Sequence, residues 1–177
     1  MLVLVGPSAS GKSAIVKKLV SDFNMQKFIT CTTRSPRVGE VDKVDYYFMS
    51  KEEFDTRYTN DEFIETVYYN GNHYGTLKSE AAMDKVVILE PNGLNNFIEK
   101  NIDLFSVFLH TDEQKLKDRM LFRGDSMPDV LKRLENDKIS FNKDALKDVN
   151  LVVDTSDLSI SEIAAIIYKN YIKYCGK

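Results

Sequence analysis

The chain has 177 residues, a formal net charge of −3, 43% hydrophobic residues, 29% charged residues and two cysteines. At this length about 70% of the unfolded chain's surface can be buried, so the composition excludes intrinsic disorder, a collagen-like repeat and a disulfide scaffold. Its apolar runs fall far short of the about 18 residues of a membrane span, and its acidic balance argues against nucleic acid or a lipid surface as a partner. We expect one cytoplasmic domain without a signal peptide, with Cys31 and Cys175 as free thiols.

Short apolar runs, typical of strands in a parallel sheet, alternate with helical patterns along most of the chain. The predicted strands are residues 2–5, 27–32, 86–89, 104–109 and 150–153. The predicted helices are residues 13–23, 92–100, 112–122, 128–139 and 159–174, the last with a capping box at Ser159 and Glu162. This alternation predicts an α/β fold, in which helices flank a parallel sheet and the crossovers are right-handed.

A glycine-rich segment follows the first predicted strand directly and leads into the first predicted helix. It reads Gly6-Pro7-Ser8-Ala9-Ser10-Gly11-Lys12-Ser13 and matches the Walker A spacing. Small residues let backbone N–H groups surround a phosphate, Lys12 reaches the outer phosphates, and the Ser13 hydroxyl is the expected Mg²⁺ ligand. The alternative is a turn that merely links strand and helix. The context favours nucleoside triphosphate binding, with the phosphates held by Ser8, Ala9, Ser10, Gly11, Lys12, Ser13 and Ala14.

Residues 33–76 interrupt the alternation. They carry a strand-like segment at 45–49, a short helical pattern at 51–58 and a second strand-like segment at 63–69. The second segment runs into Asn70-Gly71, a strong hairpin-turn signal. We therefore expect a small antiparallel subdomain inserted at 33–76, with the core formed by residues 1–32 and 77–177.

The insert also concentrates groups that can bind a phosphate. Arg34 and Arg37 flank Pro36, which stiffens the loop, and Tyr46 and Tyr74 can add hydroxyl donors. Together these four side chains can form a multidentate site for a phosphate monoester dianion. The alternative is that the arginines are solvated surface charges and the tyrosines are core residues.

A second group of arginines lies in the region predicted to be helical near residue 120. Arg119 and Arg123 are four residues apart and so share a helix face, and Gly124 with Pro128 interrupts the helix before Arg133. Arginines on a closing segment can neutralise a phosphoryl group in transit and exclude water. We expect a helical lid over about 119–133, the alternative being an exposed basic helix face.

Several of these motifs together resemble guanylate kinases. The segments that carry the resemblance are the P-loop, residues 30–40, 45–48, 52–54, 63–65 and 71–76, and, as the lid, residues 119–125 with Arg133. The resemblance implies a P-loop kinase fold with a monophosphate-binding insert and a lid. It also implies transfer of a phosphoryl group from ATP to GMP or dGMP, directly in line and with Mg²⁺.

The same resemblance implies residue roles. Glu65 would accept hydrogen bonds from the N1–H and N2–H₂ edge of guanine, and Thr30 and Thr76 would donate to its O6 and N7 side. The implied GMP site consists of Thr30, Arg34, Arg37, Tyr46, Glu65, Tyr74, Gly75, Thr76 and Glu90. The implied catalytic residues are Lys12, Arg119, Arg123 and Arg133.

One segment departs from the family pattern. Guanylate kinases typically carry Asp-x-Asp and Gln-Gly after the central strand, where this chain reads Ile88-Leu89-Glu90-Pro91-Asn92-Gly93. Glu90 replaces one of the two aspartates, and which one depends on where the gap is placed. Two alternatives therefore stay open at this stage: a kinase of another monophosphate or of a phosphorylated sugar, and a noncatalytic module that binds phosphopeptides through Arg34, Arg37 and Tyr46.

Overall fold

In the computed structural model, the described residues are 1–36, 39–69, 71–141 and 149–176. Within them, a five-stranded sheet has the order β2-β7-β1-β8-β9, and every neighbouring pair is parallel. Its strands are β1 (Leu2–Val5), β2 (Gln26–Lys27), β7 (Lys85–Ile88), β8 (Phe105–His110) and β9 (Leu151–Asp154). The predicted parallel sheet is confirmed.

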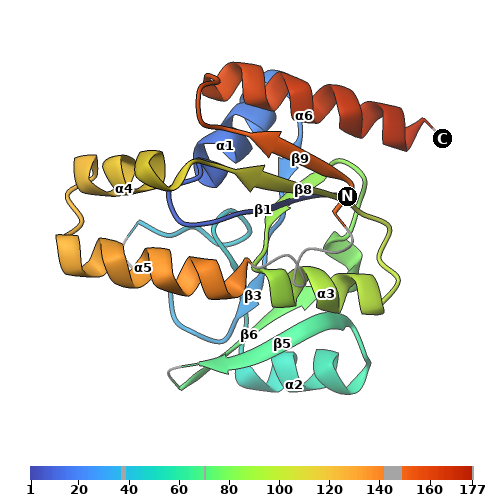
Figure 1. Ribbon diagram of the computed structural model, residues 1–177. Coiled ribbons are helices and arrows are strands. Elements are labelled where there is room, and N and C mark those ends of the chain that lie inside the picture. Colours follow the sequence, from blue (N-terminus) through green and yellow to red (C-terminus); the bar gives the residue numbers. More distant parts are fainter. Residues whose placement is uncertain (37–38, 70, 142–148, 177) are drawn as a thin grey trace.

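Helices cover both faces of this sheet (Figure 1). Leu2 and Leu4 pack into a core with α1 (Lys12–Phe23) and α6 (Ile160–Cys175). Met1, Val3 and Val5 point to the opposite face and pack against α3 (Pro91–Glu99). Because β1 is buried on both faces, its sequence is continuously apolar rather than alternating.

Two further helices lie beyond the carboxyl end of β8. They are α4 (Glu113–Phe122) and α5 (Met127–Ser140), joined by an apolar cluster of Leu116, Met120, Val130 and Leu134. The helix break predicted at Gly124 is present: φ there is +94°, and the Ser126 side chain caps α5 by accepting from the Asp129 N–H. The predicted capping box of α6 is also confirmed.

The insert forms a second sheet with the order β4-β3-β6-β5 and packs with α2 (Lys51–Thr59) (Figure 1). Its strands are β3 (Cys31–Thr32), β4 (Tyr47–Phe48), β5 (Phe63–Tyr69) and β6 (Asn72–Leu77), and a 3₁₀ turn (Lys78–Glu80) follows. The sheet is mixed rather than wholly antiparallel as expected, because β3 and β4 run parallel. It also starts before and ends after the predicted bounds of 33–76. Asn70 of the predicted hairpin turn lies outside the described residues.

The single strand predicted over 27–32 is wrong. The segment divides into β2, which pairs with β7 in the first sheet, and β3, which pairs with β6 in the second. An apolar run reveals burial but not the pairing partner, so the passage of the chain from one sheet to the other was not visible in the sequence. This passage places Thr30 between the two sheets.

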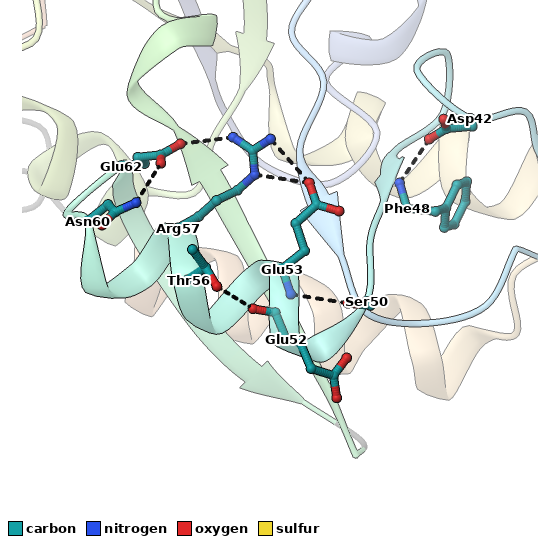
Figure 2. A network of polar contacts seen from close by, with 9 residues as sticks. All are labelled: Asp42, Phe48, Ser50, Glu52, Glu53, Thr56, Arg57, Asn60 and Glu62. Atoms are coloured by element: carbon teal, nitrogen blue, oxygen red, sulfur yellow. Dashed lines mark hydrogen bonds and ion pairs between the residues drawn. The ribbon is translucent and has the colours of Figure 1, made fainter.

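Polar contacts hold α2 in place (Figure 2). The Ser50 side chain caps its first turn by accepting from the Glu53 N–H. Arg57 forms ion pairs with Glu53 at 3.1 Å and with Glu62 at 2.8 Å, and so ties the helix to the start of β5. Exposed ion pairs of this kind stabilise a fold only weakly. We therefore attribute the position of α2 mainly to the packing of the Phe54 ring on the Phe63 ring.

Both cysteines are free thiols, as expected. Cys31 is buried in the core of the second sheet, and burial raises its pKa to about 12, so it stays protonated and unreactive. Within the described ranges, no helix is long and apolar enough to span a bilayer.

Gly75 is a packing constraint of the second sheet, and we predict that Gly75→Ala destabilises the protein. A Cβ atom there would lie 2.7 Å from two ring carbons of Phe63 and 3.1 Å from Phe54 Cζ. Overpacking of this kind costs about 1–3 kcal/mol of unfolding free energy, which urea denaturation would measure. Gly176→Ala is the matched control, because its new Cβ would make only ordinary contacts. Equal midpoints for the two variants would contradict the prediction.

Candidate functional site

The P-loop leaves the carboxyl end of β1 and enters α1 through two residues with positive φ. Gly11 has φ of +94°, and Ala9 has φ of +62°, where a side chain costs about 1–2 kcal/mol. A Cβ at Gly6 would lie 2.9 Å from the Leu109 carbonyl oxygen, so the loop passes close to β8. The backbone therefore has the shape of an anion-binding loop at a helix N-terminus.

Lys12 is folded back onto this loop. Its Nζ donates to the carbonyl oxygens of Gly6 at 2.6 Å and Pro7 at 2.8 Å. Burial lowers the pKa of Lys12, and the charges of Glu90 and Asp137 oppose that shift. Ser13 follows at the start of α1 and is exposed. Its hydroxyl oxygen is a hard ligand of the kind that suits Mg²⁺.

A cavity of about 690 Å³ opens between the two sheets. Its lining includes seven of the residues predicted to bind GMP, which come from β5, β6, the end of β7 and the connections around β3. These are Thr30, Tyr46, Glu65, Tyr74, Gly75, Thr76 and Glu90. The volume lies within the range of about 300–1,000 Å³ that is usual for small-molecule sites.

The Glu65 side chain is held in this cavity by helix α3. The Asn96 side chain on α3 donates to Glu65 Oε2 at 2.9 Å. A Cβ at Gly93 would lie 3.8 Å from Glu65 Oε1, so α3 packs directly over the carboxylate. A register irregularity between Phe63 and Glu65 changes the strand pairing at this point. Sequence reasoning missed Asn96, since nothing in a helical pattern shows which strand residue it will meet.

Arg34 pairs with an internal carboxylate. Its Nη2 lies 2.9 and 3.0 Å from the two carboxylate oxygens of Glu40, and its guanidinium centre lies 5.6 Å from the centre of the Tyr46 ring. The hydrogen bond between Arg34 and Glu40 is the main cause that raises the pKa of Arg34, and a weaker interaction with Tyr74 acts in the same direction. Arg34, Tyr46 and Tyr74 are therefore brought together. Arg37 lies outside the described residues.

Glu90 stands between the cavity and the P-loop. It is the N-cap residue of α3 and is separated from the end of β7 by Leu89, and it lines the cavity while its charge acts on Lys12. Because β1 and β7 are parallel neighbours, their carboxyl ends lie at the same edge of the sheet. The residue that departs from the family pattern therefore occupies the junction of the two sites.

The three predicted lid arginines have different surroundings. Arg119 donates to the carbonyl oxygens of Ala9 at 3.3 Å and Thr155 at 2.8 Å, so it contacts the P-loop itself. Arg123 forms an ion pair with Asp125, which lowers the pKa of that carboxyl group. Arg133 contributes to the same shift from α5 and is exposed. The structure thus brings Arg123 and Arg133 toward a shared carboxylate, while Arg119 lies closer to the phosphate loop.

A second residue missed by sequence reasoning is Asp137. Its Oδ2 accepts a hydrogen bond from the Ser8 N–H at 2.7 Å, across 129 positions of sequence. Asp137 lies on α5 among other charged residues, and no local signal distinguishes it from them.

A parallel sheet with a P-loop after its central strand, and a cavity with convergent polar side chains near that loop, define a P-loop nucleotide-binding protein of the α/β class. Comparison with known proteins narrows this class. Residues 1–170 match the family model described as guanylate kinase, and the chain belongs to that family.

Curated relatives agree with this assignment. A guanylate kinase of Clostridium perfringens is 39% identical over 160 residues, which cover 86% of this chain and 71% of the relative. A guanylate kinase of Symbiobacterium thermophilum is 35% identical over 176 residues, covering 94% and 83% of the two chains. In structure, guanylate kinase from Anaplasma phagocytophilum superposes with a TM-score of 0.62 at 22% identity, covering 98% of this chain and 85% of that one. The structural likeness supports the fold alone.

We predict that Asn96→Ala weakens GMP binding by about three- to tenfold, the equivalent of one hydrogen bond. Without the Asn96 amide, the Glu65 carboxylate is free to leave the orientation it has in the cavity. Isothermal titration of GMP in the absence of ATP measures the effect. Asn95→Ala is the matched control, an exposed neighbour on the same helix. Equal affinities for the two variants would show that Asn96 does not position Glu65.

Proposed function

We propose that this chain transfers the terminal phosphoryl group of ATP to GMP or dGMP, which yields ADP and GDP or dGDP. The observation that carries the proposal is the cavity of about 690 Å³, in which two carboxylates, three threonines and two tyrosines gather near a P-loop. Membership of the guanylate kinase family and relatives of that name at 35–39% identity support the same reaction.

The cavity has the chemistry to select guanine. In this proposal the Glu65 carboxylate accepts from N1–H and N2–H₂, while Thr30 and Thr76 donate on the O6 and N7 side. Adenine presents an acceptor at N1, so it would face Glu65 with no proton to share. A bound base would cover the half-buried Glu65 carboxylate, and covering it without donors is costly, so such sites reject the wrong base strongly.

The acceptor phosphate is assigned to Arg34, Tyr46 and Tyr74, with Arg37 as a further proposed contact. Arg34 now donates from Nη2 to both carboxylate oxygens of Glu40, and a phosphate offers anionic oxygen acceptors of the same kind. A bound GMP phosphate would replace or share that partner. In this proposal the nucleophilic oxygen belongs to the GMP phosphate that Arg34, Tyr46 and Tyr74 hold.

The donor phosphates are assigned to the loop of Ser8 to Ala14. Lys12 would leave the carbonyls of Gly6 and Pro7 and pair with the phosphate oxygens, while Arg119, Arg123 and Arg133 stabilise the charge that moves. A Mg²⁺ ion held by Ser13 and the nucleotide would supply further charge neutralisation. In-line transfer between aligned oxygens needs no covalent intermediate on the protein.

The acceptor is tested with a panel of monophosphates in a coupled assay of ADP release. We expect turnover with GMP and dGMP, and at least about 100-fold lower kcat/KM with AMP, because its N1 cannot donate to Glu65. CMP, UMP and a sugar phosphate complete the panel. Turnover on one of these with none on GMP or dGMP would overturn the proposal in favour of another acceptor. The absence of turnover on every acceptor, with phosphopeptide binding, would favour a noncatalytic module.

Lys12→Ala tests the phosphate loop. We expect turnover to fall by about a thousandfold, because the variant loses the charge that stabilises the transferring group. GMP affinity should stay within about twofold, since Lys12 is not part of the cavity lining. Lys17→Ala, an exposed residue on the same helix, is the control. Undiminished turnover in Lys12→Ala would contradict the assigned role.

A further inference from the structure

Asp137 on α5 contacts the phosphate loop, and the proposed reaction does not use this contact. Its Oδ2 accepts from the Ser8 N–H at 2.7 Å, and the contact is partly buried. Ser8 is among the loop residues assigned to the ATP phosphates. A carboxylate oxygen therefore already accepts the hydrogen bond that the Ser8 N–H would donate to a phosphate oxygen.

The groups around the contact between Asp137 and Ser8 also form a site suited to an anion. The loop offers backbone N–H groups at a helix N-terminus together with the Lys12 ammonium, which is the chemistry of an anion site. Asp137 is close enough to Lys12 for its negative charge to act on that ammonium. It brings a negative charge to the loop from another helix, α5, rather than from the loop itself.

The Asp137 side chain also has space into which it can move away from the Ser8 N–H. Asp137 borders a cavity of about 220 Å³ that is also lined by Pro7, Thr111 and Leu134. The side chain can rotate into that space while α5 stays packed on α4 through Leu134 and its neighbours. Displacement therefore does not require the helix to unfold.

We propose that Asp137 is an internal competitor of the donor phosphate, which sets the affinity of the loop for ATP. This proposal rests on one part of the proposed function, namely that the loop binds ATP. One N–H group cannot serve the carboxylate and a phosphate at once, and two anions this close repel each other. ATP binding must therefore displace Asp137, and the free energy of the Asp137–Ser8 contact is subtracted from that of ATP binding.

The test compares Asp137→Ala and Asp137→Asn with the wild-type chain by isothermal titration with Mg·ATP and, separately, with GMP. Both variants remove the charge, and the asparagine keeps nearly the same shape. We expect the Kd for ATP to fall by about tenfold in Asp137→Ala, the equivalent of about 1.4 kcal/mol, and by less in Asp137→Asn, whose side-chain oxygen can still accept from the Ser8 N–H. The Kd for GMP should stay unchanged within about twofold. Glu135→Gln, an exposed carboxylate on the same helix, is the matched control and should leave both values unchanged.

A thermal shift measurement provides an independent readout of the same contact. Without nucleotide, Asp137→Ala should melt below the wild type, because the link between α5 and the loop is lost. With saturating Mg·ATP, it should gain more degrees than the wild type gains. Unchanged or weaker ATP binding in both variants would overturn the proposal.

Failure of this inference is distinguishable from failure of the proposed function. Turnover of the wild-type chain with GMP or dGMP tests the reaction, whereas the ATP affinities compare variants in a binding experiment without an acceptor. A wild-type chain that phosphorylates GMP while its Asp137 variants bind ATP no more tightly would overturn the inference alone.

Discussion

The arrangement depends on one constraint: β1 is buried on both faces and pairs in parallel with both β7 and β8. Parallel pairing brings the carboxyl ends of these strands to one edge of the sheet. The P-loop follows β1 there, and Glu90 follows β7. At the same edge, Thr111 after β8 and Thr155 after β9 share a buried hydrogen bond of 2.6 Å. Thr155 also binds Arg119 through its carbonyl. Residues distant in sequence meet at this edge because the strands that carry them are aligned.

Three of the groups assigned to substrate phosphates are already engaged with partners inside the protein. Arg34 holds Glu40, Lys12 holds two loop carbonyls, and the Ser8 N–H holds Asp137. A partly buried cation or N–H group without a partner costs free energy, so each group has an internal acceptor in this conformation. Substrate binding then becomes an exchange of partners. Its net free energy is the difference between two sets of polar contacts, which makes the internal partners determinants of affinity.

The second sheet connects recognition with packing. Gly75 lines the cavity while its backbone lies against the rings of Phe54 and Phe63, so one residue belongs both to the cavity wall and to the core of the insert. Ile64, next to Glu65 on β5, packs instead into the core shared with α3. Glu65 is consequently held between the second sheet and α3, where Asn96 reaches its carboxylate. The position of Glu65 is therefore fixed by two cores rather than by its own strand alone.

The resemblance to guanylate kinases implied the residues that line the cavity between the two sheets. Local pattern in the sequence determined the phosphate loop, most strands and helices, and the helix break at Gly124. These features depend on hydrophobic periodicity, backbone preference and motif spacing, and all three are set by residues that lie close together in the sequence. Only the tertiary structure decided that residues 27–32 divide between two sheets, that Glu90 joins the two sites, and that Asn96 and Asp137 reach Glu65 and Ser8. Such contacts arise from strand register and helix docking over long separations in the chain. A helical pattern gives the face of a residue but not the atom it will meet.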